Sequence, residues 1–171
     1  MKNILIIGGT KGIGKSIVDN LVDDYNITCL SRNKLDFQHQ NFVHKEFDAL
    51  SDEYPEMDSL DCLIYCPGSI NLKPISTLTL EDFRNDFEIN VIGAVKAIKK
   101  YLPLLKKSLS ASILLFSTVA TKLGMPYHAS VSVAKSGVDG LVKTLGSELA
   151  PKVRINAIAP TITNTDLASK I

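Results

Sequence analysis

Short apolar runs alternate along the chain with longer segments in which apolar residues recur every three or four positions. The runs lie at residues 4–7, 27–30, 62–65 and 112–116, with a weaker one at 42–47 and another at 154–158 that also contain polar residues. Helical spacing begins at Ile13, Ile17 and Leu21, and it returns at 80–107 and 130–149. Apolar strands that alternate with helices indicate a parallel sheet covered on both faces. The pattern predicts an α/β fold: a three-layer, doubly wound parallel sheet of six strands.

Two segments depart from a regular alternation. Residues 48–62 are short and polar, so we expect a turn or a single helical turn there instead of a full crossover helix. Pro103 lies near the end of the helix predicted over 80–107, where we expect a bend. Because no repeat or shift in composition divides the chain, residues 1–171 are predicted to form one domain.

Composition excludes several classes of protein. The 171 residues are 45% hydrophobic and 22% charged, with a net charge of +1. Without a basic stripe, nucleic acid is not an expected partner. The apolar runs are too short for a signal peptide or a membrane span. Cys29, Cys62 and Cys66 lie in or beside apolar runs without a histidine cluster, so we expect reduced structural thiols, no metal site and a cytoplasmic protein.

The first strand leads directly into a glycine-rich turn, which a helix follows. Glycines permit a tight turn and the close approach of a pyrophosphate. The free N–H groups and positive dipole end of the new helix favour phosphate. A tight turn without a ligand is the alternative. The sequence therefore predicts a dinucleotide site at Gly8, Thr10, Lys11, Gly12, Ile13 and Gly14.

The spacing of these glycines resembles that of the classical short-chain dehydrogenases/reductases, and the resemblance covers essentially the whole chain. It implies a Rossmann fold, a nicotinamide cofactor and hydride transfer to or from a small carbonyl or alcohol substrate. Members of this family commonly assemble through two long helices, which here are 80–107 and 130–149. The resemblance therefore implies a homodimer or homotetramer.

The end of the second strand bears on the choice of nicotinamide cofactor. NAD sites place a carboxylate there to bind the ribose 2′-hydroxyl. This chain instead has Ser31, Arg32 and Asn33, with Lys11 in the neighbouring turn. A 2′-phosphate requires cations, so we predict NADP(H) instead of NAD(H). The alternative is that Lys11 and Arg32 are solvated surface charges.

The resemblance implies further cofactor contacts in three loops that follow strands. Asp48 matches the family's adenine-binding aspartate, although an aspartate after a strand can equally cap a turn. After the fourth strand the family usually has Asn-Asn-Ala-Gly, of which this chain keeps only the glycine, Gly68. In the loop after the sixth strand, which in the family contacts the nicotinamide, Thr161 replaces a glycine. The implied contacts are Asp48, Ala49, Cys66, Pro67, Gly68, Pro160, Thr163 and Thr165.

Three of the family's four catalytic positions are matched. Asn90 lies on the first long helix, Thr118 stands at the serine position, and Lys135 lies on the second long helix. The resemblance implies that Thr118 polarises the substrate oxygen, while Lys135 holds the nicotinamide ribose. Asn90 and Lys135 thus belong to both the catalytic and the cofactor-binding sets.

The fourth catalytic position is a tyrosine in the family and Val131 in this chain. Valine cannot transfer a proton. Tyr127, His128 or an ordered water held by Thr118 and Lys135 are the alternatives that we consider.

The chain also ends at Ile171, where family members continue through a substrate loop, a helix and a seventh strand. We therefore expect a C-terminally truncated, atypical member of the family. The favoured hypothesis is an NADP(H)-dependent oxidoreductase, and the alternative is a non-catalytic NADP-binding sensor or partner subunit.

Overall fold

In the computed structural model, which describes residues 1–170, six parallel strands form one sheet in the order β3-β2-β1-β4-β5-β6. Neighbouring strands are parallel at each of the five pairings. The predicted six-stranded sheet is confirmed. The strands are β1 (Asn3–Ile7), β2 (Asn26–Ser31), β3 (Phe42–Glu46), β4 (Cys62–Tyr65), β5 (Ala111–Phe116) and β6 (Val153–Ile158).

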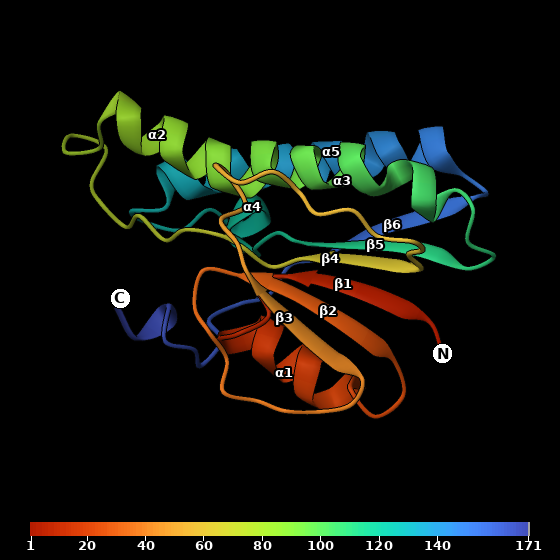
Figure 1. The fold of residues 1–171 in the computed structure, drawn as a ribbon. Helices are drawn as coiled ribbons and strands as arrows, with labels where there is room; N and C mark the ends of the chain where they lie inside the picture. The colour runs from red at the N-terminus through yellow and green to blue at the C-terminus, as the bar shows by residue number, and fades with distance from the viewer. Residues whose placement is uncertain (171) are drawn as a thin grey trace.

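Helices cover both faces of this sheet, as Figure 1 shows. Helix α1 (Gly12–Leu21) lies on one face, and α2 (Leu80–Phe87), α3 (Gly93–Leu105) and α5 (Ala129–Leu149) lie on the other. Alternate residues of β1 serve the two cores. Leu5 and Ile7 pack toward α3 and α5, while Ile4 and Ile6 pack toward α1. This alternation explains why the central strands are apolar throughout.

The first long helix is less regular than its sequence predicts. It begins at a capping box, in which Thr79 Oγ1 accepts from the Asp82 N–H (3.1 Å) and the Asp82 carboxylate accepts from the Thr79 N–H (2.9 Å). A π-helical turn, η1 (Glu88–Ile92), then separates α2 from α3. The helix runs through Pro103 and ends at Leu105. Periodicity predicted its extent but missed the π-helical turn.

Residues 48–61 form a turn and an extended segment, as predicted. Aromatic packing takes the place of a crossover helix. The ring centroid of buried Tyr54 lies 4.7 Å from that of Phe47 and 5.9 Å from that of Tyr101. The Tyr101 hydroxyl donates to the Pro55 carbonyl (2.8 Å), which fixes the segment against α3. The short helices α4 (Ala120–Leu123) and η2 (Ala168–Lys170) were not predicted.

The sheet reverses its direction of winding between β1 and β4. The chain moves outward through β2 and β3 on one side, and through β5 and β6 on the other. Loops that leave β1 and β4 therefore diverge at the carboxyl ends of the strands, where open α/β sheets form their binding crevice.

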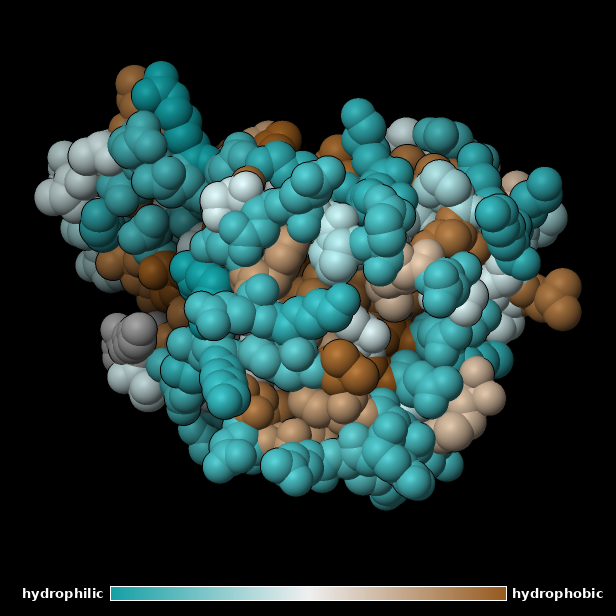
Figure 2. Space-filling model, in the orientation of Figure 1, coloured by the Kyte–Doolittle hydropathy of each residue, from teal (hydrophilic) through white to brown (hydrophobic). Residues whose placement is uncertain are grey.

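The outer surface is mainly hydrophilic, as expected for a fold that buries its apolar strands. Figure 2 shows that hydrophilic residues cover most of the face seen in Figure 1. No helix within residues 1–170 is long and apolar enough to cross a membrane. Cys29 is buried, Cys62 and Cys66 are half-buried, and all three are free thiols.

Candidate active site

A cavity of about 610 Å³ opens at the carboxyl ends of the strands. Loops that follow all six strands line it, so it runs across the sheet past the point where the winding reverses. It brings together the following residues singled out by the sequence: Gly8, Thr10, Lys11, Gly12, Ile13, Gly14, Ser31, Arg32, Asn33, Asp48, Ala49, Cys66, Pro67, Gly68, Thr118, Lys135, Pro160, Thr163 and Thr165.

The glycine turn has a backbone that other residues would not adopt easily. Gly8 (φ 79°) and Gly12 (φ 52°) lie in the left-handed region. A Cβ atom on Gly14 would lie 2.2 Å from the Gly8 carbonyl oxygen. The start of α1 therefore packs directly against the end of β1. Without side chains at these glycines, a ligand can approach the backbone of the turn closely.

The first turn of α1 is left open for an anion. Its N-cap residue, Lys11, makes no capping hydrogen bond with its side chain, and no acidic residue lies in the first turn. Uncapped N–H groups at a helix N-terminus bind phosphate. The loop after β6 packs on this turn, since a Cβ on Gly12 would lie 3.2 Å from the Thr165 methyl group. The turn thus forms a cradle that fits a pyrophosphate.

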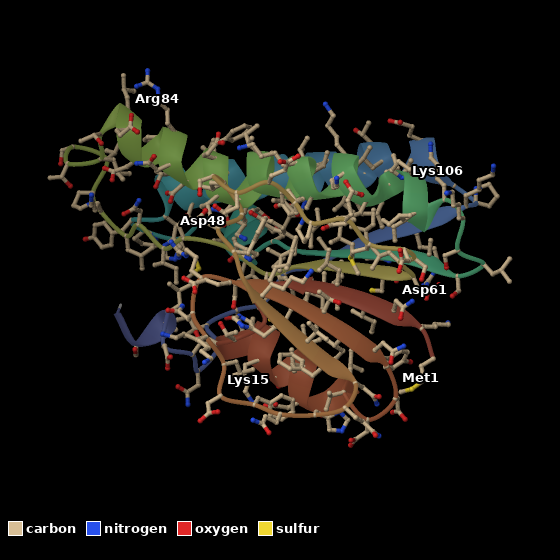
Figure 3. The ribbon with its side chains drawn as sticks, in the orientation of Figure 1. Met1, Lys15, Asp48, Asp61, Arg84 and Lys106 are labelled. Carbon is tan, nitrogen blue, oxygen red and sulfur yellow. The ribbon has the colours of Figure 1, made fainter. Side chains whose placement is uncertain are left out.

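Arg32 and Asp48 lie together at the outer end of the cavity. Arg32 Nη1 is 3.9 Å from Asp48 Oδ2, and the arginine side chain is 75% exposed. Figure 3 shows Asp48 beyond the carboxyl end of β3, far from Asp61, which directly precedes β4 at the amino ends of the strands. Asp48 Oδ1 accepts from the Leu50 N–H (2.9 Å), so the carboxylate also caps the turn. Both interpretations of Asp48 raised by the sequence therefore remain.

Lys135 is buried at the opposite end of the cavity, with 9% of its surface exposed. Its Nζ donates to the Phe116 carbonyl at the end of β5 (2.7 Å). Burial lowers the pKa of this lysine from 10.5 to about 8, although Cys66, Asp139 and Asp86 act in the opposite direction. Lys135 is therefore a buried residue of the cavity wall and not a solvated surface lysine.

Asn90 is buried behind the cavity wall and is not among the lining residues, so its direct contact with the cofactor stays a prediction. Its Nδ2 donates to the Asp86 carbonyl (2.8 Å) and to Ser69 Oγ (3.0 Å). Ser69 in turn donates to the buried Asp86 carboxylate (2.5 Å). A Cβ on Gly68 would lie 3.1 Å from Asn90 Oδ1 and 3.4 Å from Lys135 Nζ, so both side chains reach this wall segment from behind.

The comparisons with known proteins agree with this geometry. A family model described as enoyl-(acyl carrier protein) reductase matches residues 7–171. The chain belongs to the short-chain dehydrogenase/reductase family. It is 30% identical to a tropinone reductase homologue of Arabidopsis thaliana, over 99% of this chain and 72% of the relative.

Two further members of the family illustrate the likeness. A 3-oxoacyl-[acyl-carrier-protein] reductase of Buchnera aphidicola is 25% identical, over 99% of this chain and 77% of the relative. A solved structure of ElxO with NADP bound is 27% identical and superposes with a TM-score of 0.88, covering 99% of this chain and 77% of that one.

The departure from the family at position 131 has a structural consequence. Val131 is buried and lines the cavity with Thr118 and Lys135, so the place expected for the phenol holds only an aliphatic group. Of the two proposed substitutes, Tyr127 is 60% exposed and does not line the cavity, whereas His128 does. Helix α5 begins at Ala129, so both residues precede it.

Several lining residues were not singled out from the sequence. They include Ser69 and Ile70 after β4, and Ile162 and Asp166 after β6. Their positions next to residues that were singled out are the only signal that could have found them. Conformation of the loops, and not residue type, brings them to the cavity.

Proposed function

We propose that the chain is an NADP(H)-dependent oxidoreductase that transfers a hydride between the nicotinamide and a carbonyl or alcohol substrate. The observation that carries this proposal is one cavity with a phosphate cradle at Gly8–Gly14, cations at Lys11 and Arg32, and a buried lysine at Lys135. The NADP in the solved ElxO structure supports the choice of cofactor.

The residues present suit each part of this cofactor. The uncapped first turn of α1 would hold the pyrophosphate, Arg32 and Lys11 the 2′-phosphate, and Lys135 the nicotinamide ribose. The loop with Pro160, Thr163 and Thr165 would hold the nicotinamide end. When bound, the cofactor supplies or accepts the hydride.

The chain's own groups would act on the substrate oxygen and on the frame around it. Thr118 Oγ1 accepts from the Ala120 N–H (3.3 Å), which leaves its own proton to donate to that oxygen. Asn90 would act as a positioning residue, because it ties the π-helical turn to the wall at Ser69.

A second candidate function is a non-catalytic NADP-binding sensor or partner subunit. Val131 favours it, because the family's proton-transferring phenol is missing from an otherwise matched site. We also predict that the chain forms a homodimer or homotetramer and that it is located in the cytoplasm.

Titration with NADPH and with NADH, followed by nicotinamide fluorescence, tests the shared part of both candidates. We expect tight binding of NADPH and weak binding of NADH. At 100 times its Kd, NADPH should raise the free energy of unfolding by about 2.7 kcal/mol. Binding of neither cofactor would overturn both candidates.

Val131→Tyr then separates the two candidates. A gain in NADPH-dependent reduction of ketones would mark a catalytic site that only lacks the phenol. The matched control is Val43→Tyr, which adds the same group at an exposed position of β3 outside the cavity. Equal, negligible turnover in both variants would favour the non-catalytic module.

A further inference from the structure

A second hollow, of about 490 Å³, adjoins the cavity. Its walls are largely apolar, with Pro74 and Ile75 on one side and Ala120 and Ala129 on the other. Met125 and His128 line both the cavity and this groove, and therefore mark the place where the two meet. A molecule that spans the junction would have one end in the cavity and the other in apolar surroundings.

The backbone around His128 holds its ring at this junction. Tyr127 adopts a left-handed backbone (φ 66°), which is uncommon for a residue other than glycine and is a feature that clusters at functional sites. The Tyr127 carbonyl accepts from the Lys73 N–H (3.2 Å), and the His128 carbonyl accepts from the Ser132 N–H at the start of α5 (2.8 Å). Tyr127 is consequently exposed, while the histidine is half-buried between the two hollows.

The hydrogen bond of the imidazole determines which nitrogen is available. His128 Nδ1 lies 2.7 Å from the Pro126 carbonyl oxygen. A carbonyl oxygen can only accept, so Nδ1 carries a proton and donates it there. The nitrogen that exchanges a proton with another molecule is therefore Nε2.

We propose that His128 is the proton donor that acts in place of the missing tyrosine, on carbonyl compounds whose apolar substituent lies in the groove. This inference rests on the proposed function. His128 is the N-cap residue of α5, and it lines the cavity together with Val131, Thr118 and Lys135. It is the histidine of residues 1–170 that lines either hollow.

The reaction balances with the proposed cofactor as reductant. The hydride adds to the carbonyl carbon, and the π electron pair of the C=O bond moves to the oxygen. That oxygen takes the proton from Nε2 of the imidazolium. The products are the alcohol, NADP+ and a neutral imidazole, which regains a proton from water because the ring is half-buried. Thr118 would donate a hydrogen bond to the same oxygen.

Other ionisable groups face the same space. Lys73 and Tyr127 line the groove with His128. Burial holds the pKa of the Cys66 thiol at about 12, so this thiol is a weak acid near neutrality. Lys135 is the rival proton donor, although its amine is engaged with the Phe116 carbonyl. The other ionisable groups that line the cavity are Lys11, Arg32, Asp48 and Asp166.

The test measures NADPH-dependent reduction of 2-octanone and acetophenone from pH 5 to pH 9.5. The variants are His128→Gln, the double variant His128→Gln/Val131→Tyr, and His39→Gln as a control outside both hollows. NADPH affinity of each variant and the proton NMR titration of the His128 ring supply readouts that do not depend on turnover.

We expect His128→Gln to lower kcat about 100-fold with NADPH affinity unchanged. The wild-type rate should fall with rising pH at the midpoint found for the His128 ring by NMR. The double variant should regain activity without that midpoint, and His39→Gln should behave as wild type.

Unchanged kcat in His128→Gln, or a wild-type pH profile that this variant retains, would overturn the inference and point to Lys135 or water. NADPH binding without reduction of either ketone would overturn it as well, while the cofactor site would stand. Failure to bind NADPH would instead overturn the proposed function itself.

Discussion

The amine of Lys135 is buried, and burial disfavours its positively charged form. Its pKa in the folded chain is about 8, against 10.5 for an ordinary lysine. Below pH 8 both the folded and the unfolded chain bind the proton, and the buried charge costs about 3 kcal/mol of stability. Between pH 8 and 10.5 only the unfolded chain binds the proton. In this range Lys135 therefore makes the free energy of unfolding increase as the pH rises.

Lys135→Met should therefore stabilise the fold and weaken the site. We expect the free energy of unfolding at pH 7 to rise by about 2 kcal/mol, since the lost hydrogen bond to Phe116 offsets about 1 kcal/mol of the gain. The difference should shrink toward pH 10.5, and NADPH affinity should fall. Urea unfolding at pH 7 and pH 10 measures this, with Lys143→Met on the exposed side of α5 as control. A gain that is equal at both pH values would contradict the assignment.

Arg32 is the residue on which the preference for NADP(H) depends. Arg32→Asp would place a second carboxylate beside Asp48, whose Oδ2 lies 3.9 Å from Arg32 Nη1. We expect the ratio of NADPH to NADH affinity to fall at least about tenfold, which corresponds to about 1.4 kcal/mol. Lys34→Asp makes the same change of charge nearby but outside the cavity. If both variants leave the ratio unchanged, Arg32 is a solvated surface charge.

At the scale of elements, the π-helical turn decides where Asn90 points. Such turns leave carbonyl groups without their usual helical partners. Here the Tyr65 hydroxyl, at the end of β4, donates to the Ile89 carbonyl (2.8 Å). The two elements approach so closely that a Cβ on Gly93 would lie 2.0 Å from the Tyr65 hydroxyl oxygen. Tyr65 and Gly93 thus fit each other across the helix–sheet interface.

Tyr65→Phe should destabilise the chain by about 1 kcal/mol, because the partly buried Ile89 carbonyl would lose its hydrogen-bond donor. Urea unfolding at pH 7 measures the change. Tyr25→Phe is the matched control, since the hydroxyl of Tyr25 makes no hydrogen bond within the described part of the chain. A loss that is no larger than that of the control would show that the π-helical turn does not need this hydroxyl.

On the scale of the whole molecule, the site is a property of the topology. Residues from the loop after β1 to the loop after β6 meet in one cavity because the winding reverses between β1 and β4. The phosphate cradle, the charged outer end and the buried lysine are therefore held by one rigid sheet. The helices on its upper face in Figure 1 leave apolar side chains exposed, among them Phe87 on α2 and Val133 on α5.

Assembly through these helices would cover the two side chains. We expect sedimentation velocity at micromolar concentration to show a dimer or tetramer, and Val133→Glu to shift it toward the monomer. Val43→Glu places the same charge on the exposed edge strand β3 and should leave the mass unchanged. A wild-type monomer would contradict the predicted assembly.

The strands, the three-layer fold and the residues of the cradle could all be predicted from residue order and residue type. The uninterrupted apolar runs of the central strands require burial on both faces, and glycine is favoured where φ is positive at Gly8 and Gly12. The substitution of Val131 was likewise visible in the sequence alone, since it follows from residue identity at a matched position.

The placement of Asn90, the capping hydrogen bond of Asp48 and the position of His128 became evident only from the three-dimensional contacts. Each depends on a local backbone that side-chain periodicity does not encode: the π-helical turn at Glu88–Ile92, the turn after β3 and the left-handed Tyr127. The shift in the pKa of Lys135 belongs here as well, because burial is set by residues distant in the sequence that close over the amine. Patterning fixes which elements form, while contacts between them fix what each side chain can reach.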